Sequence, residues 1–521
     1  MKKNVFCLFM LFVGLLSSIF VFAQKEQKLQ SDNGDGTFTN PLIFADFPDP
    51  DIIKVESVYY MVTTTMFIFP GVTILKSYDL VNWEYCTNAI PRMECSKCYN
   101  LDGCNRYHHG QWATSLKYHN GKYYMLFITL DEGGFICTSS KPEGPWQIKK
   151  LPKGFHDPGL FFDEETNKIY VAYGYETIRV TELDTSFAPI GKDVAVFKAD
   201  IGNEKGLEGT HVYKINGLYY LYCTYGGMMG FQVALRSKSI FGPYEEKIVI
   251  RDTVGPAKTI HQGALVQTNT GEWWTVLFVD EGPFGRMPFL QPVTWKDGWT
   301  MVGDKGKGVV TYKKPNVGKT YPIKKWFNSD EFNNKTLGLQ WGWNHNPDFT
   351  NWVLTNEGTL RLTTSKVVTS LPEARNTLTQ RIFSYYNNTP TIATTKLTTK
   401  NMLEGDVAGL AVFQDPYAFI GVKIINGKSY VMMNNNSKTI DSALINKPIV
   451  YLRAEAHFNT NKSTFSYSTD NKRFYRLGNE LNMQFNLSVF TGNKFCLFDY
   501  STKSVGGFVD FDWFRTNETS K

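Results

Sequence analysis

The chain has 521 residues, of which 55 are lysine or arginine and 49 are aspartate or glutamate, so its formal net charge is +6. That excess is small for this length and no long basic tract accompanies it, which argues against nucleic acid as a partner. The length exceeds what one hydrophobic core serves, so we expect two domains. Aromatic residues make up 15% of the chain, which is typical of β-structure and also suits stacking on sugar rings.

The N-terminus has the pattern of a secretory signal peptide. Lys2 and Lys3 precede an apolar run over residues 5–22, and the small residue Ala23 follows it. We therefore expect residues 1–23 to be removed and the mature protein to be exported, either to a periplasm or to the medium. An N-terminal membrane anchor is the alternative. No later stretch is long and apolar enough to predict a membrane span after signal cleavage.

Residues 32–322 contain five similar β-units. Each unit has a strand, a tight turn and a second strand that begins with an aromatic residue. These aromatic positions lie 46 to 64 residues apart: Tyr60, Tyr124, Tyr170, Tyr220 and Trp274. The region alternates with period two, has turn signals such as Asn216-Gly217, and lacks sustained helical periodicity. Five units of this size predict a five-bladed β-propeller.

A polar or aromatic residue precedes each of these positions by 11 to 13 residues: Asp49, Trp112, Asp157, Glu208 and His261. Equivalent positions of propeller blades converge on the central axis, so these five side chains should form one ring. Three carboxylates, a tryptophan and a histidine make a poor structural core but a good active site. An isolated Asp-Pro would be better explained as a turn, and the shared repeat position favours catalysis instead.

Six motifs follow one another through the predicted propeller: NPLIFADFPDPDIIKVESVYYMVTTTMFIFPGVTILKSYDLVNW, GQWATSLKYHNGKYY, HDPGLFFD, GLEGTHVYK, HQGALVQTNTGEWW and GRMPFLQPVTWKDGW. Together they resemble family 43 of the glycoside hydrolases, in particular its β-xylosidase and α-L-arabinofuranosidase branch. The resemblance covers essentially the whole propeller. It implies a general base at Asp49, a pKa-modulating aspartate at Asp157 and a general acid at Glu208.

The implied reaction is an inverting, exo-acting hydrolysis that releases terminal or side-chain pentoses from hemicellulose. One protonated carboxyl group protonates the leaving oxygen, and one carboxylate activates water on the other face of the sugar. A further carboxylate beside the acid raises the pKa of that acid by like-charge repulsion. This chemistry requires no cofactor. A non-catalytic glycan-binding propeller is the alternative function, and the presence of all three carboxylates favours the enzyme.

The resemblance also implies the residues that contact the sugar. Arg286 matches the family's substrate-binding arginine, and Trp112 matches its pocket-wall tryptophan. His261 matches an axial histidine beside a structural calcium or other cation, with a satisfied core histidine as the alternative. Residues 66–71, which include Met66 and Phe69, resemble the loop that walls the pocket. Because the flexible Met66 replaces a phenylalanine of related β-xylosidases, we expect arabinofuranose to be slightly preferred to xylose.

Four of the eight cysteines fall within nineteen residues: Cys86, Cys95, Cys98 and Cys104. In an exported protein this spacing favours two local disulfides. A four-thiolate zinc site is the alternative, because Cys95-x-x-Cys98 has the spacing of zinc ligands, although no second such pair completes it. Either arrangement would hold an insertion of the first repeat interval in place.

The composition changes after Tyr321-Pro322, and we expect residues 325–521 to form a second domain. Residues 328–332, 467–472 and 508–514 resemble the concanavalin-like β-sandwich, a jelly roll, that follows the propeller in many family members. Alternating strands in this region support a sandwich independently. Since no long linker separates the domains, we expect the sandwich to buttress the pocket and not to move as a separate module.

Overall fold

The computed structural model describes residues 29–516 except residues 200–205, 228, 327 and 385–388; the predicted signal peptide lies outside the described residues. Its regular structure consists of β-strands and three short 3₁₀ helices: η1 (Lys97–Asn100), η2 (Gly282–Phe284) and η3 (Leu371–Glu373). In this part of the chain no helix is long and apolar enough to cross a membrane. The expectation of an all-β protein is confirmed.

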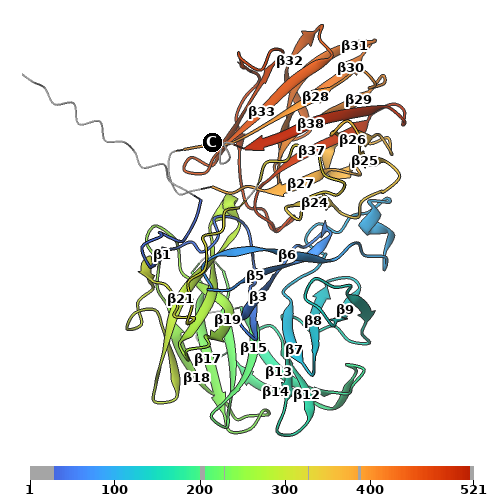
Figure 1. The fold of residues 1–521 in the computed structure, drawn as a ribbon. Helices are drawn as coiled ribbons and strands as arrows, with labels where there is room; N and C mark the ends of the chain where they lie inside the picture. Colours follow the sequence, from blue (N-terminus) through green and yellow to red (C-terminus); the bar gives the residue numbers. More distant parts are fainter. Residues whose placement is uncertain (1–28, 200–205, 228, 327, 385–388, 517–521) are drawn as a thin grey trace, which may run out of the picture.

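Five four-stranded antiparallel sheets form the first domain, drawn from blue to yellow-green in Figure 1. The first blade contains β2 (Asp51–Val55), β3 (Val58–Thr63), β5 (Gly71–Ser77) and β6 (Trp83–Ile90), and the second contains β7 (Ser115–His119), β8 (Lys122–Thr129), β9 (Gly133–Ser139) and β10 (Gln147–Lys150). The third blade contains β11 (Gly159–Asp163), β12 (Lys168–Tyr173), β13 (Thr177–Leu183) and β14 (Pro189–Lys198), and the fourth contains β15 (Leu207–Ile215), β16 (Leu218–Tyr225), β17 (Phe231–Ser237) and β18 (Glu245–Ile250). The fifth blade contains β19 (His261–Gln267), β20 (Trp273–Asp280), β21 (Arg286–Lys296) and β22 (Trp299–Val302). The first strand of each blade contacts the first strand of the next, and β19 contacts β2, so the ring closes. The five-bladed propeller is confirmed.

The tight turns explain why the sequence folds into these hairpins. At Asn120-Gly121, Asn216-Gly217 and Asp297-Gly298 both turn residues have positive φ, with values of 48° and 76°, 52° and 75°, and 54° and 73°. Two-residue turns of this kind match the right-handed twist of the strands that they join. Outside the blades, β1 (Thr37–Thr39) pairs with β23 (Thr311–Lys313), which ties the start of the domain to its end.

The second domain is a sandwich of two sheets, drawn in orange and red in Figure 1. One sheet has the order β32 (Lys438–Ile445), β31 (Lys428–Asn435), β30 (Ala418–Ile425), β29 (Asp406–Phe413), β37 (Lys494–Ser501), β27 (Leu378–Arg381), β24 (Trp341–Asn344) and β4 (Ile68–Phe69). The other has the order β25 (Trp352–Leu354), β26 (Leu360–Thr363), β38 (Phe508–Thr516), β28 (Thr391–Thr398), β33 (Ile449–His457), β34 (Lys462–Ser468) and β35 (Tyr475–Arg476), with β36 (Leu481–Asn482) also paired to β34.

The central strand β29 is buried on both faces, unlike the alternating strand β28. Leu410 and Val412 point into the core between the two sheets. Ala411 and Phe413 belong to a second apolar cluster that also contains Met66 of the propeller. The outer face of this sheet is therefore covered by the first domain.

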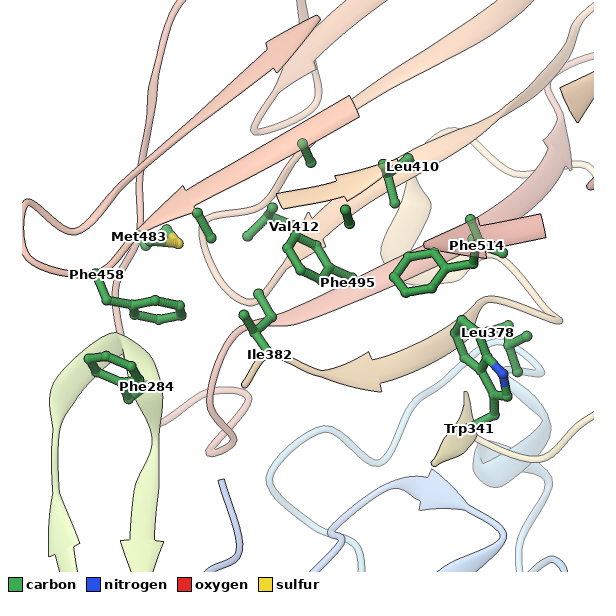
Figure 2. Close-up of a cluster of buried hydrophobic side chains, with 14 of the residues drawn as sticks. Phe284, Trp341, Leu378, Ile382, Leu410, Val412, Phe458, Met483, Phe495 and Phe514 are labelled. Carbon is green, nitrogen blue, oxygen red and sulfur yellow. The ribbon is translucent and has the colours of Figure 1, made fainter. Parts of the chain in front are cut away.

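The two domains share a sheet and a hydrophobic contact. The short strand β4, which lies in the first blade's sequence, pairs with β24 of the sandwich, so that Phe69 lies opposite Trp343. Phe284, between β20 and β21, stacks on Phe458 at a ring-centroid distance of 4.0 Å. Figure 2 shows this propeller hairpin reaching the apolar cluster of the sandwich. The domain junction is thus a packed interface.

Candidate active site

The structure places the repeat residues at the beginnings of the innermost strands. Asp49 and Asp157 each lie two positions before such a strand and directly before a proline. Their φ values are 53° and 45°, a conformation that costs free energy for residues other than glycine and that is concentrated at functional sites. Glu208 lies in β15, at an irregularity in its pairing with β16. The two aspartates thus share one strained backbone conformation in two blades.

Asp49 forms a buried ion pair with Arg286. The Nη1 group of Arg286 donates to Oδ1 of Asp49 at 2.7 Å, and the two residues are 5% and 7% exposed. Within the described residues, Nε and Nη2 of Arg286 are buried and have no hydrogen-bond partner. Leaving such groups unpaired costs about 1–3 kcal/mol each. A ligand with hydroxyl groups beside Asp49 would satisfy them.

Glu208 lies beside Asp157 and His156. Nε2 of His156 is 3.0 Å from Oε2 of Glu208 and 3.9 Å from Oδ1 of Asp157. The backbone N–H of Gly209 donates to Oδ2 of Asp157 at 3.1 Å, and the side-chain amide of Gln262 donates to the same oxygen at 3.4 Å. Two carboxyl groups and an imidazole therefore share one small volume.

Burial and charge displace the pKa values of these groups from their ordinary ranges. Burial raises the pKa of Asp157 to about 6, with the Glu208 charge adding to it and His156 opposing it. Burial lowers the pKa of His156, but the carboxylates of Asp157 and Glu208 outweigh this effect and raise that pKa to about 9. Burial also raises the pKa of Asp49, against the opposing charge of Arg286. Neighbouring groups with such displaced pKa values are candidates for proton transfer.

Aromatic side chains from both domains lie beside these groups. The ring of Trp112 lies 5.2 Å from that of Phe490 and 6.0 Å from that of His156. Phe490 belongs to the sandwich and also faces the guanidinium of Arg286 at 4.6 Å. His108 packs against both Trp112 and Phe490. The second domain thus supplies part of the site.

The same group of side chains is also the candidate cation site of the structure. Ligand atoms of His156, Asp157 and Glu208 all lie within 4.8 Å of one another. One imidazole and two carboxylates suit a divalent cation such as Zn²⁺. A cation bound there would occupy Glu208, the predicted proton donor.

Comparison with known proteins identifies both halves of the chain. Residues 38–300 match the family described as glycosyl hydrolases family 43, and residues 329–517 match the β-xylosidase C-terminal concanavalin A-like domain. The chain belongs to glycosyl hydrolase family 43. It is a glycosidase of the β-xylosidase and arabinofuranosidase type, and the predicted sandwich is of the expected concanavalin-like kind.

Relatives of this family 43 enzyme include both activities of that branch. A β-xylosidase of Formosa agariphila is 33% identical over 93% of this chain and 90% of its own length. A non-reducing end α-L-arabinofuranosidase of Bacteroides ovatus, BoGH43B, is 34% identical over 70% of this chain and 69% of its own length. The structure of a bifunctional GH43-CE protein of Bacteroides eggerthii superposes with a TM-score of 0.85 at 36% identity. That match covers 93% of this chain but 64% of the bifunctional protein.

Met66 and Phe69 have no exposed side chain that could contact a sugar, contrary to expectation. Both are 0% exposed. Phe69 lies in the pairing with β24 and contacts Tyr99 at a ring-centroid distance of 5.6 Å. Met66 lies in the apolar cluster against which Trp112 packs. The segment therefore packs against the sandwich, and through Met66 it supports Trp112 and does not contact the sugar itself. Because Met66 has no exposed surface, it gives no support to the expected preference for arabinofuranose, which stays a prediction.

His261 is a satisfied core histidine and not a ligand that faces the pocket. It is 1% exposed, its Nε2 lies 3.1 Å from Oδ2 of Asp280, and its Nδ1 lies 3.3 Å from the hydroxyl of Thr224. Both ring nitrogens are therefore engaged. The side chains that could hold a cation are those of His156, Asp157 and Glu208. The expectation that His261 contacts a cation or the sugar is therefore not supported.

The cysteine cluster contains one disulfide, between Cys98 and Cys104. Cys86 and Cys95 are free thiols, so the expectation of two bridges is half right. The bridge also removes two of the four thiolates that a zinc site would need. It closes the segment that leads from η1 toward His108 and Trp112.

Three residues of the site were missed in the sequence. His156 stands directly before Asp157, and its position beside a predicted catalytic aspartate was an available signal. Asp46 accepts hydrogen bonds from the backbone N–H groups of Arg286 and Gly492, both at 2.9 Å. Phe490 lies far along the chain in the other domain. No periodicity connects it to the propeller, so only the fold could reveal it.

Proposed function

We propose that the protein is an exo-acting, inverting glycosidase that releases terminal or side-chain pentoses, α-L-arabinofuranose or β-D-xylose, from hemicellulose. The observation that carries this proposal is the buried Asp49–Arg286 pair, whose arginine has two unpartnered N–H groups. A fork of donors beside a carboxylate suits the binding of sugar hydroxyls next to an activated water. The similarity to β-xylosidases and to an arabinofuranosidase supports pentoses as the sugars.

In the proposed reaction Asp49 removes a proton from water as that water attacks the anomeric carbon. Glu208 donates its proton to the glycosidic oxygen as the bond between this oxygen and the anomeric carbon breaks. Asp49 thus ends protonated and Glu208 ends ionised, and exchange with solvent restores both. A single displacement inverts the anomeric configuration.

The cluster around Glu208 supplies the proton. His156, with a pKa of about 9, stays protonated at neutral pH, while burial and the neighbouring charge of Glu208 raise the pKa of Asp157 to about 6. The carboxyl group of Asp157 lies beside that of Glu208, where a like charge favours the protonated form of the proposed acid. Asp157 therefore acts on the proton affinity of the acid and not on the sugar.

The aromatic side chains beside Arg286 support cleavage at chain ends and side branches. Trp112 and Phe490 close one side from two different domains, and Phe490 also faces Arg286. A site closed in this way suits one sugar and not a threaded chain. We also propose, from the N-terminal pattern of residues 1–23, that the enzyme acts after export.

Proton NMR during the first turnovers tests the mechanism. The substrates are nitrophenyl α-L-arabinofuranoside and nitrophenyl β-D-xyloside, with the Asp49→Ala variant as the inactive control. The expected product has inverted anomeric configuration, and Asp49→Ala releases no sugar from either substrate. Retained configuration would overturn the single displacement. Efficient cleavage within long unbranched xylan or arabinan would overturn the exo-acting assignment, and no turnover of either pentoside would overturn pentoside hydrolysis.

A further inference from the structure

Two aspartates of the sandwich have their carboxyl groups in the interior of that domain. Asp406 begins β29, and Asp499 lies in β37, the neighbouring strand of the same sheet (Figure 1). Asp499 pairs with Ala408, which lies two residues after Asp406, so all three side chains are on one face of the sheet. Ala408 belongs to the apolar cluster between the two sheets. The aspartates are 0% and 3% exposed, so both are inside the sandwich.

The two carboxyl groups lie close enough to interact. Asp406 pairs with Ser501 and Asp499 with Ala408, so the aspartates are diagonal neighbours across the strand pair. Residues in this relation are about 7–8 Å apart, a distance from which two side chains can direct their oxygens to one point. Burial raises the pKa of Asp499 well above its usual range, and the charge of Asp406 raises it further. The two groups therefore repel each other when both are ionised.

Three of the four carboxylate oxygens have no partner. Within the described residues, Oδ1 of Asp406 and both Oδ1 and Oδ2 of Asp499 are buried and accept no hydrogen bond of regular geometry. Oδ2 of Asp406 accepts the backbone N–H of Leu403 at 2.6 Å. No cationic side chain of the described segments acts on the pKa of either aspartate. Buried carboxylates are normally paired or coordinate a metal ion, so these two lack a partner of one of these kinds.

A proton shared by the two groups would leave this arrangement incomplete. One carboxyl group could then donate to the other, but the second oxygen of Asp499 would still need a donor. A hard cation instead contacts several oxygens at once and compensates both charges. Ca²⁺ binds carboxylates through one or both oxygens, and carbonyl oxygens and waters complete its sites. The two free oxygens of Asp499 suit the two-oxygen mode, and the hydroxyl of Ser501, which is 0% exposed, adds an oxygen beside Asp406.

The facing sheet leaves room for these groups at this point. Gly507 directly precedes β38, and a Cβ atom there would collide with Oδ2 of Asp406. The hydroxyl of Thr364 accepts the backbone N–H of Gly506 at 2.9 Å and donates to the carbonyl of Gly507 at 3.2 Å. A side chain at position 507 would thus exclude the carboxyl group. The backbone of the second sheet is therefore fitted to the aspartate and not to an apolar side chain.

We propose that Asp406 and Asp499 hold a calcium ion inside the sandwich, with the hydroxyl of Ser501 as a further ligand. The ion joins β29 to β37 and removes the repulsion between their carboxylates. The outer faces of the same strands carry apolar side chains of the cluster against which Trp112 packs. The ion thus fixes the sheet that supports this tryptophan. Its role is structural, and the site is separate from the group around His156.

Two variants of the same shape and one control test the site. Asp499→Asn and Asp406→Asn each remove one charge, and because they relieve the repulsion between the carboxylates, both variants should fold. Asp512→Asn is the control. It removes the same charge from β38, where the partly exposed Asp512 pairs with Lys396 at 2.7 Å. All three variants keep the candidate cation site of the propeller, so a cation bound there contributes equally to each.

The first readout is the calcium content of the full-length protein after equilibration with calcium and removal of the excess. We expect both core variants to hold one calcium ion per chain fewer than Asp512→Asn. The second readout is the change in Tm when calcium, about a hundredfold above its Kd, is added to protein treated with EDTA. Calcium should raise the Tm of the unaltered protein and of the control by about 5 °C more than that of Asp499→Asn.

Equal calcium contents in the control and in both core variants overturn the inference. An unaltered protein that binds no calcium also overturns it. Two carboxyl groups that share a proton give a third result: the Tm ignores calcium and EDTA and falls as the pH rises from about 5 to about 8, because stability from a raised pKa is lost as the proton leaves. That result overturns the cation as well. None of these measurements uses hydrolysis, so their outcome is independent of the proposed function.

Discussion

Replacing Asp46 by asparagine should weaken the hydrogen bonds that connect Arg286, at the start of β21, to the loop that contains Phe490. Asp46 accepts the backbone N–H of Arg286 on Oδ1 and that of Gly492 on Oδ2, both at 2.9 Å. Its Oδ2 also lies 3.5 Å from Nζ of Lys494, and both side chains are almost completely buried. One carboxylate thus serves two backbone donors and one buried cation. Asparagine retains one oxygen and places an N–H₂ group where the other acceptor was.

The expected loss of stability follows from the burial of Lys494. Burial lowers the pKa of this lysine and the charge of Asp46 opposes that effect, so the carboxylate favours the charged form of the buried ammonium. Removing one partner of a buried ion pair costs about 3–5 kcal/mol. Because the introduced asparagine keeps the bond from Arg286, we expect Asp46→Asn to lower the free energy of unfolding by about 3 kcal/mol. Lys494→Met should cost less, about 1 kcal/mol, because the two backbone donors still hold the carboxylate.

Urea unfolding and enzyme kinetics measure the two consequences. In a double-mutant cycle, Asp46→Asn combined with Lys494→Met should be more stable than the sum of the single losses, by about 2 kcal/mol. The kcat/KM on nitrophenyl pentosides should fall about tenfold or more, because Arg286 and Phe490 lose their common support. A loss below 1 kcal/mol for Asp46→Asn, or additive losses in the cycle, would refute the role of the pair.

The remaining predictions concern the acid and the disulfide. Glu208→Ala should spare aryl glycosides whose leaving groups need little protonation, but should lose about a hundredfold on poor leaving groups; equal losses on both would exclude Glu208 as the acid. His156→Asn removes a cation that favours ionised carboxylates, so the alkaline limb of the kcat/KM profile should move up by about one pH unit, whereas Asp157→Asn removes a like charge and should move that limb down. Shifts in the reverse directions would contradict these roles. Replacing both Cys98 and Cys104 by serine should lower the free energy of unfolding by about 2 kcal/mol, and an unchanged urea midpoint would show that the bridge adds no stability.

The sequence predicted most of the propeller because the blades repeat, and the same repeat placed the three carboxylates at equivalent positions of their blades. Equivalent positions in five blades converge on the axis, so the spacing between Asp49, Asp157 and Glu208 and their aromatic partners already placed them together. The structure adds that the two aspartates share a positive φ. The turns at Asn-Gly and Asp-Gly could also be predicted, because their conformation depends on the two turn residues alone.

The errors concern residues whose neighbours lie far from them in the sequence, in the other domain or in another blade. The loop containing Met66 and Phe69 occupies the place in the sequence where a pocket wall was expected, but its side chains point into the junction with the sandwich. His261 has the expected position in its blade, yet Asp280 and Thr224 occupy its ring nitrogens. Periodicity identifies the face of a strand and not what covers that face. Contacts between distant segments therefore cannot be predicted from periodicity.

The sandwich is better understood as part of the active site than as an appended binding module. It extends its own sheet with β4, a strand from the first blade's sequence, and its Arg381 donates to the backbone carbonyl of Asp46 at 2.7 Å. The same domain contributes Phe490 to the wall beside Arg286. A module that moved freely could keep neither contact. Catalysis also favours a fixed domain, because small displacements of positioning groups lower the rate by large factors. The shared sheet thus explains how a side chain almost at the far end of the chain keeps a fixed place beside the Asp49–Arg286 pair.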